Sequence, residues 1–255
     1  MKKSCLGFLC GCALLLSAGS LQAQVVKEIH FSAAEGYTDG PLVGQPAGSD
    51  SKWIAGSADM GEDIYIVKNE AMVVQPIPNM QVWIYIPIPV QKMDSGTITF
   101  LWDWQYFGPP EKKMDLGFVP SDSGNYMKDG SPFAAFGEQS CPMRMGDVID
   151  ARKGDLACGG TWVSDNGVPY RDGVLVHMRM TIDLNELDFS VFAQREGEEE
   201  VQVAENFMMR CMPSDATGGL NTMTFWVNGG DVETSVVLDN FILIGPSSTQ
   251  DWDLY

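Results

Sequence analysis

Apolar and polar residues alternate along several segments of this chain, most regularly between residues 174 and 183. Even-numbered positions from Val176 to Ile182 are apolar, and odd-numbered positions from His177 to Asp183 are polar or charged. A period of two residues is typical of a β-strand with one buried and one exposed face. A polar turn follows, and a second apolar run covers residues 188–194, so this region is predicted to form a β-hairpin.

Runs of β-branched and aromatic residues recur elsewhere, separated by Gly, Pro, Asn and Asp. They cover residues 27–32, 64–68, 71–75, 81–86, 97–106, 114–119, 132–136, 201–204, 221–228 and 235–244. Helical periodicity is not sustained in any segment, and only a short helical turn around residues 203–209 is expected. Many short strands with frequent turns predict an all-β fold, a β-sandwich jelly roll of two antiparallel sheets.

The N-terminus has the pattern of a signal peptide. Two lysines precede an apolar stretch, and Leu21-Gln22-Ala23 forms a small-residue cleavage site. The stretch is too short for a transmembrane anchor, which needs about 20 apolar residues. We therefore expect a signal peptide at 1–23, a jelly-roll domain at 24–245 and a flexible tail at 246–255. Such a protein is secreted, or periplasmic or extracellular, after cleavage.

Acidic residues outnumber basic ones, 34 to 16, giving a formal net charge of −18. Nucleic acids and anionic membranes are bound through clustered Lys and Arg, so both are unfavourable partners. The composition leaves the oligomeric state open.

Six cysteines occur, and three of them precede the predicted cleavage site. Export permits a disulfide among Cys141, Cys158 and Cys211, and the first two are the preferred pair. With two histidines and no Cys-x-x-Cys, a zinc site of ordinary spacing is not expected.

Two strands place polar side chains where a saccharide could bind. His177 and Arg179 share the polar face of the first, while Trp226 and Asn228 lie opposite the apolar positions of residues 221–228. Trp can stack on sugar rings, and Arg and Asn can bond hydroxyl groups. The alternative is that these are ordinary solvent-facing residues of a half-exposed sheet.

Trp104 belongs to an aromatic stripe at alternate positions of residues 98–106. Core packing is the favoured interpretation of that stripe, because aromatic side chains bury large areas. Trp104 lies near the end of the strand and remains a candidate for a cleft at the sandwich edge.

Three segments carry a resemblance to a known superfamily: VLVHMRMTIDLNELDFSVFA at 174–193, SVVLDNFILIG at 235–245 and HFSAAEGYTDGPLVGQ at 30–45. Their pattern resembles that of concanavalin A-like (LamG-type) lectin and glucanase domains of secreted bacterial proteins. The resemblance implies a jelly roll. It also implies a role among carbohydrate-binding modules, polysaccharide hydrolases and adhesion modules.

Glucan-cleaving members of that superfamily carry Glu-x-Asp-x-(x)-Glu on one strand face. The nearest segment here begins with Glu186 and Asp188 but has Ser190 or Val191 in place of the second Glu, and it starts in the hairpin turn. Retaining glycosidases need two closely spaced carboxylates, and no Ser-His-Asp pattern is visible either. We expect no catalysis.

Calcium is the favoured cofactor, since jelly rolls of this kind can hold a structural Ca²⁺ between first and last strands. Glu28 on the first strand and Asp239 on the last are the predicted ligands. Asp239 shares its face with Val237 and Phe241, which predicts apolar surroundings for its carboxylate. The alternative is that backbone amides at the sheet end bond this carboxylate.

The predicted function is a non-catalytic module that binds extracellular polysaccharide or glycan. A structural or adhesive envelope protein is the first alternative. A polysaccharide hydrolase or lyase with unplaced carboxylates is the second.

Overall fold

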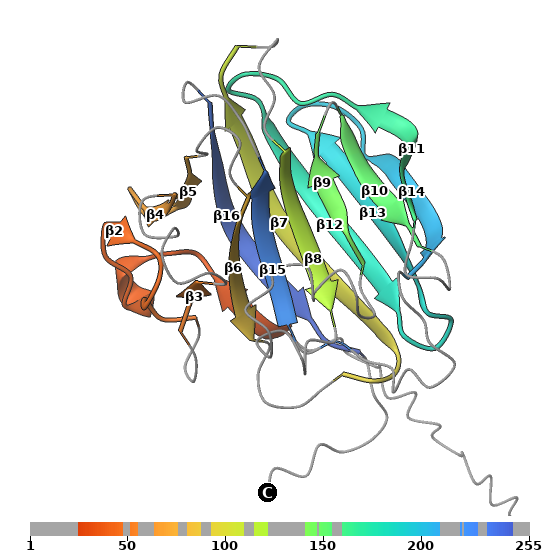
Figure 1. Cartoon of the computed structure of the whole chain (residues 1–255), viewed down its shortest axis with the longest axis horizontal. Helices are drawn as coiled ribbons and strands as arrows, with labels where there is room; N and C mark the ends of the chain where they lie inside the picture. The colour runs from red at the N-terminus through yellow and green to blue at the C-terminus, as the bar shows by residue number, and fades with distance from the viewer. Residues whose placement is uncertain are drawn as a thin grey trace, which may run out of the picture.

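The computed structural model describes residues 25–47, 52–55, 64–75, 81–87, 93–109, 115–121, 141–146, 148–154, 160–209, 220, 222–228 and 234–246. Nearly all of the described chain lies in strands or turns. The exception is a single turn of 3₁₀ helix, η1 (Ala33–Glu35), which follows the first strand. The strands form two antiparallel sheets that lie one behind the other (Figure 1), so the predicted all-β jelly-roll sandwich is confirmed.

The larger sheet has nine strands. Along its main path the order is β14 (Val201–Met208), β13 (Asp188–Arg195), β12 (Leu175–Asp183), β7 (Thr97–Phe107), β16 (Ser235–Ile244), β5 (Met72–Val74), β4 (Tyr65–Val67) and β2 (Gly40–Pro41). The ninth strand, β1 (Val25–Ile29), pairs with the second half of β16, whereas β5 pairs with its first half.

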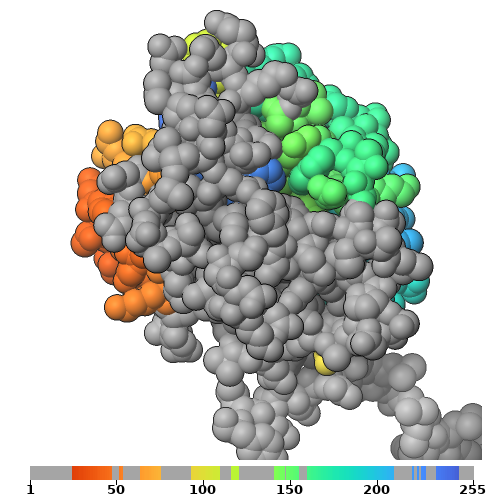
Figure 2. All heavy atoms as spheres, viewed as in Figure 1, coloured from red at the N-terminus to blue at the C-terminus, as the bar shows by residue number. Residues whose placement is uncertain are grey.

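The smaller sheet has seven strands. Their order is β11 (Thr161–Val168), β10 (Ile149–Lys153), β9 (Met143–Met145), β8 (Asp115–Ser121), β15 (Thr222–Asn228), β6 (Gln81–Pro87) and β3 (Ile54–Ala55). Figure 2, drawn from the same side as Figure 1, shows the N-terminal strands at one flank and β9 to β11 at the other.

Aromatic rings join the two sheets in the core. Phe100 and Trp102 of β7 contact Phe118 of β8, with ring centroids 5.3 and 4.8 Å apart, and Phe241 of β16 packs 5.6 Å from Phe118. Edge-on and tilted contacts of this kind add to the stability that aromatic burial provides. The predicted aromatic stripe of residues 98–106 is therefore core.

Strand β12 shows how the sequence pattern orients a strand. Val176, Met178, Met180 and Ile182 are all at most 2% exposed, whereas the polar positions between them lie on the outer face of the nine-stranded sheet. The β12–β13 register runs without a shift from Val176↔Arg195 to Asp183↔Asp188. The predicted hairpin is confirmed.

A β-bulge interrupts β16. Its register with β7 shifts between Asp239 and Ile242, and Asn240 has a φ of 53° in the left-handed region, which asparagine tolerates better than most residues. The extra residue moves Phe241 into the core, at 4% exposure, while Asp239 and Asn240 stay on the outer side.

Side chains of β11 cover the open edge of β14. Asn166 donates from Nδ2 to the carbonyl of Gln202 (3.0 Å), and the amide of Glu205 donates to Asp165 (3.1 Å). An uncovered edge strand can pair with another chain, and bonds of this kind occupy groups that would do so.

Other features of the sequence prediction need correction. Residues 203–209 were predicted to form a helical turn, but residues up to Met208 continue β14, whose burial pattern follows the sheet. Strands β9, β10 and β11 lie between residues 143 and 168, where the sequence analysis predicts no strand. The predicted strand at 132–136, the signal peptide and nearly all of the tail lie outside the described residues.

Cys141 is fully buried and carries a free thiol, so the preferred Cys141–Cys158 disulfide is not formed. Cys158 and Cys211 lie outside the described residues. Burial raises the pKa of the Cys141 thiol well above its usual value. Within the part of the chain that the structure describes, no helix is long and apolar enough to span a bilayer.

Candidate functional site

Both histidines of the chain lie on the outer face of the nine-stranded sheet. His177 of β12 stands directly opposite Asp103 of β7, and its Nδ1 is 2.7 Å from the Asp103 carboxylate. The His177 side chain is 47% exposed, compared with 17% for Asp103. The carboxylate holds the imidazole by one nitrogen and leaves the other ring edge available to a ligand.

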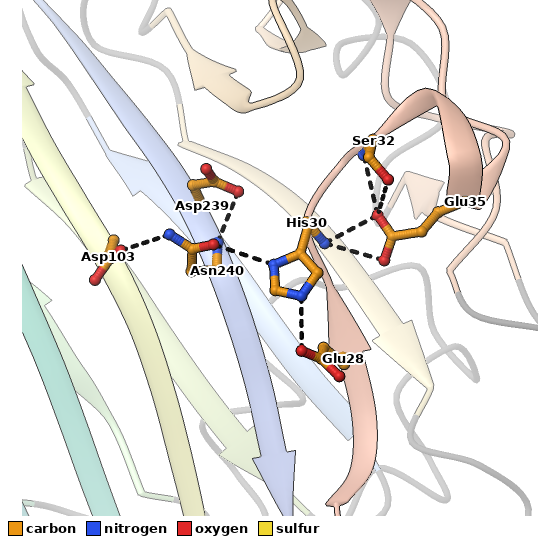
Figure 3. Close-up of polar contacts among 7 residues, drawn as sticks. All are labelled: Glu28, His30, Ser32, Glu35, Asp103, Asp239 and Asn240. Carbon is orange, nitrogen blue, oxygen red and sulfur yellow. Dashed lines mark hydrogen bonds and ion pairs between the residues drawn. The ribbon is translucent and has the colours of Figure 1, made fainter.

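A chain of polar contacts continues from Asp103 across β16 to the segment that follows β1 (Figure 3). Asn240 donates from Nδ2 to Asp103 (2.7 Å), and its Oδ1 lies 3.1 Å from Nδ1 of His30. His30 Nε2 lies 2.7 Å from Glu28 Oε1. Because an ionised carboxylate only accepts, Asp103 orients the Asn240 amide so that its oxygen faces His30.

The His30 ring therefore faces an acceptor at each nitrogen, which favours its protonated form. The hydrogen bond to Glu28 raises the pKa of His30 above its usual value, against a smaller opposing effect of burial. Glu35 of η1 holds the backbone there, because its carboxylate accepts from the amides of His30 and Ser32 at 3.0–3.1 Å. This turn fixes the position of His30 beside β16.

Arg179 lies two residues beyond His177 on the same face. Its Nε donates to Glu200 (3.0 Å), a second bond joins Nη2 to the same carboxylate, and its guanidinium carbon lies 3.6 Å from the Phe192 ring centre. The charge of Arg179 is thus neutralised and its plane is stacked, so it presents a rigid surface.

Further along β12 the same face is hollowed where the β12–β13 hairpin ends. This hollow, the hairpin cavity, has a volume of about 340 Å³ and is lined by Thr97, Thr181, Asp183, Glu186, Asp188, Ser190 and Asn206. All seven side chains are polar. They come from β7, β12, β13, β14 and the hairpin turn.

Local hydrogen bonds fix the shape of the hairpin cavity. Asp183 Oδ1 accepts from the backbone amides of Asn185 and Glu186 (2.8 and 3.2 Å), which closes the turn. Ser190 is 7% exposed; its Oγ accepts from the amide of Asn206 (2.9 Å) and lies 3.2 Å from that residue's Oδ1. Burial, followed by the charges of Asp183 and Glu186, raises the pKa of Asp188.

The structure places the predicted tryptophans away from solvent. Trp104 is fully buried in the core, and Trp226, although it faces outward from β15, is 3% exposed and packs with Val119 and Trp162. Neither can stack on a sugar as placed, so the prediction of an exposed Trp226 is wrong. Alternation along the strand identified its face correctly, but alternation does not reveal what covers a face. The Asn228 side chain lies outside the described residues.

The predicted calcium ligands do not form a ready site. Glu28 bonds His30, and Asp239 accepts from the amide of Asn240 (2.7 Å), as the backbone-amide alternative anticipated. Of the two apolar neighbours predicted for Asp239, Val237 shares its face, but the bulge turns Phe241 inward. Burial raises the pKa of Asp239. Among the described residues no group of three or more His, Cys, Asp or Glu could hold a metal ion. Calcium binding stays a prediction.

Sequence reasoning identified His177 and Arg179 as candidates but missed the hairpin cavity. The sequence places the segment around Glu186 and Asp188 at the hairpin turn and predicts no site there. A signal was present, since Asp183 and Asp188 flank a tight turn and must stand opposite each other in a hairpin. The contribution of Thr97 and Asn206 depends on strand order, which one sequence does not reveal.

Comparison with known proteins identifies the fold. No protein-family model matches the chain, and no curated protein matches it. Lectin II from Ulex europaeus superposes with a TM-score of 0.53 at 8% identity, covering 81% of this chain and 96% of the lectin. The Emp47p carbohydrate recognition domain gives 0.53 at 12% identity, covering 89% and 98%.

The CBM2 module of the Lactobacillus casei BL23 phage J-1 evolved Dit gives a TM-score of 0.54 at 11% identity, covering 89% of this chain and 98% of that module. A match to a sialidase spans only 17% of that much longer chain. At these identities the likeness concerns architecture. The chain has the concanavalin A-like jelly-roll fold of legume lectins and lectin-like carbohydrate recognition domains.

Proposed function

We propose that this protein is an exported, non-catalytic module that binds glycans on the outer face of its nine-stranded sheet. The observation that carries the proposal is the hairpin cavity, a hollow of about 340 Å³ lined by polar side chains alone. Its volume lies at the lower end of the range of about 300–1,000 Å³ found for small-molecule sites. The names of structural neighbours, a lectin and carbohydrate recognition domains among them, support the same class of ligand.

The lining chemistry suits a saccharide. Sugar hydroxyl groups both donate and accept hydrogen bonds, and the hairpin cavity offers the hydroxyls of Thr97 and Thr181 together with carboxylate acceptors. A polar hollow that already holds its side chains in place through local bonds loses less conformational entropy on binding.

The proposed surface extends beyond one sugar unit. Thr181 and His177 point to the same side of β12 and are four residues apart, which corresponds to about 13 Å at 3.3 Å per residue. An oligosaccharide anchored in the hairpin cavity could therefore run along β12 past Arg179 to His177. The roles of His177 and Arg179 as ligand-binding residues are part of this proposal.

The test is a glycan and polysaccharide array with the chain from residue 24 onward, run with calcium and again with a chelator. Thr181→Tyr places a ring in the hairpin cavity and should abolish binding to any glycan that the wild-type protein retains. Thr161→Tyr is the matched control, because Thr161 is exposed on edge strand β11 of the seven-stranded sheet and does not line the cavity.

Saturable binding that Thr181→Tyr removes and Thr161→Tyr preserves supports the proposal. Binding that survives Thr181→Tyr contradicts the assignment of the site. Absence of binding across the array, together with concentration-dependent self-association, would favour a structural or adhesive protein instead. Loss of binding on chelation would support the predicted calcium ion.

A further inference from the structure

The contact between His177 and Asp103 decides which ring nitrogen of His177 carries the proton. Nδ1 lies 2.7 Å from Oδ1 of Asp103, and an ionised carboxylate only accepts hydrogen bonds. A neutral imidazole in this position must therefore hold its proton on Nδ1 and keep a lone pair on Nε2. A histidine side chain in water prefers the opposite arrangement, so the contact selects the less common tautomer.

Asp103 is held from its other side by Asn240. Its Oδ2 accepts from Nδ2 of Asn240 (2.7 Å), so each carboxylate oxygen is bonded to a different side chain. Asp103 is also mostly buried, at 17% exposure, between its register partners His177 of β12 and Asp239 of β16. Rotation of the carboxylate would break both bonds, and the imidazole is therefore fixed as long as Asn240 stays in place.

The bulge of β16 brings Asn240 to this position. In an unbroken strand, residue 240 would point away from the face of Asp239 and into the core. The register shift between Asp239 and Ile242 makes it an extra residue instead, with a φ of 53° and an exposed side chain. Figure 3 shows the Asn240 amide between Asp103 and His30, whose Nδ1 lies 3.1 Å from the amide oxygen. A bulge that re-aims one side chain in this way is typical of functional sites.

The opposite edge of the His177 ring is open. The side chain is 47% exposed, and among the residues that the structure describes none bonds its Nε2. Thr181, which lines the hairpin cavity, lies four residues along the same face of β12. A glycan that runs along this face therefore meets a neutral ring whose exposed nitrogen accepts hydrogen bonds and cannot donate them.

We propose that Asp103 and Asn240 are positioning residues that fix His177 as a hydrogen-bond acceptor for a hydroxyl group of the glycan. This inference rests on the proposed glycan-binding function and deepens it, because it states which chemical group His177 recognises. A free hydroxyl can donate to the lone pair of Nε2, whereas an ether or ester oxygen only accepts. A site built to bond a hydroxyl rejects an analogue that lacks it.

The first test needs no ligand. The chain has two histidines, so nitrogen NMR of the imidazole rings gives two sets of signals, and His177→Gln identifies the His177 set by removing it. The spectra are recorded at a pH of about 9, well above the ordinary imidazole pKa of about 6.5. We expect the His177 proton on Nδ1 in the wild-type protein and on Nε2 in Asp103→Ala, which lacks the acceptor. A wild-type proton on Nε2 would overturn the inference.

Asn240→Gly tests the positioning role separately. Glycine adopts positive φ without strain, so this variant keeps the backbone of the bulge and loses only the amide side chain. Asn69→Gly is the matched control, because Asn69 has the same φ of 53° but lies in the exposed turn between β4 and β5, outside the polar chain. The share of His177 with its proton on Nδ1 should fall in Asn240→Gly and stay unchanged in Asn69→Gly. Equal effects in the two variants, or no effect in either, would show that Asn240 does not position His177.

Calorimetry at the same pH then links the tautomer to binding, with the glycan that gives the strongest array signal as the probe. Asn240→Gly should bind it about threefold to tenfold more weakly than the wild-type protein, the loss expected for one weakened hydrogen bond, and Asn69→Gly should bind it equally well. One monomethyl ether of that glycan should bind the wild-type protein more weakly. His177→Phe, which lacks the acceptor, should not distinguish this ether from the parent glycan. Unchanged affinity in Asn240→Gly, or methylation losses that all persist in His177→Phe, overturn the inference.

The failures are distinguishable. A wrong tautomer, with a glycan bound in the array, overturns the roles of Asp103 and Asn240 but leaves the proposed glycan-binding function standing. An array without any bound glycan contradicts the proposed function, and with it the recognition of a hydroxyl, even if NMR shows the expected tautomer.

Discussion

Gly117 of β8 stands directly opposite Trp226 of β15, and the indole lies over the glycine. A Cβ added at Gly117 would lie 1.8 Å from Nε1 and 2.1 Å from Cε2 of Trp226, far inside contact distance. Gly117→Ala must therefore push the indole from its buried position. The substitution tests whether Trp226 is part of the packed structure or, as its sequence pattern suggested, an exposed platform for sugars.

The two single variants have predictable costs. Overpacking by Gly117→Ala should cost about 1–3 kcal/mol of unfolding free energy. Trp226→Ala should cost about 3–5 kcal/mol, because the side chain is 3% exposed. With the indole removed, Gly117→Ala should instead stabilise the strand by about 0.5–1 kcal/mol. The effect of Gly117→Ala thus differs by about 1.5–4 kcal/mol between the two backgrounds.

Urea unfolding followed by circular dichroism measures these differences, with an unchanged m-value as the criterion of comparable unfolding. Gly167→Ala in β11 is the control, because the nearest atom to its Cβ would be in Val148 at 3.6 Å, an ordinary contact. Equal costs of Gly117→Ala with and without the indole would refute the packing described for this face. A stable Trp226→Ala protein with lost glycan affinity would restore the platform hypothesis.

Three further variants test local electrostatics and the sheet edge. Asp188→Asn should raise the unfolding free energy at neutral pH by about 0.2–1 kcal/mol, because it relieves repulsion from Asp183. Burial raises the folded-state pKa of Asp188. The gain should therefore vanish below the unfolded-state pKa of 3.8, where Asp188 is itself protonated. His30→Gln should remove a stabilisation that is complete below the unfolded-state pKa of 6.5 and is lost as pH rises through the higher folded-state pKa. Urea midpoints of the wild-type and variant proteins over a pH series measure this effect. A difference between the two proteins that does not change with pH would exclude a protonated His30 bonded to Glu28. Asn166→Ala should cost about 0.5–1.5 kcal/mol and leave glycan affinity unchanged; a neutral result would mean that its bond to β14 does not stabilise the edge.

Strand periodicity predicted the architecture and the faces of β12 because both depend on neighbours along the chain. Its failure at Phe241 has a local cause: the bulge at Asn240 inserts one residue and reverses the alternation beyond it. A period of two carries no mark of such an insertion.

The polar chain from His177 to His30 illustrates a second limit of prediction from sequence, namely contacts between segments far apart in the chain. Asp103 and Asn240 are 137 residues apart in sequence, and His30 and Asn240 are 210 apart. Their contact follows from the order β12–β7–β16–β1, which depends on long-range pairing. Alternation placed His177 on a polar face, but alternation along one strand does not reveal which strands lie beside it.

The position of β16 has a consequence for how the molecule is made. This strand, one of the last segments of the chain, joins β7 on one side to β1 and β5 on the other. Until residues 235–244 have been synthesised, two parts of the larger sheet share no strand. One part is β1, β2, β4 and β5, and the other is β7, β12, β13 and β14. We therefore expect the two parts of the larger sheet to stay separate in a nascent chain until β16 inserts between them. Truncation just before Ser235 should leave a chain unable to fold, even though every residue of the hairpin cavity would still be present.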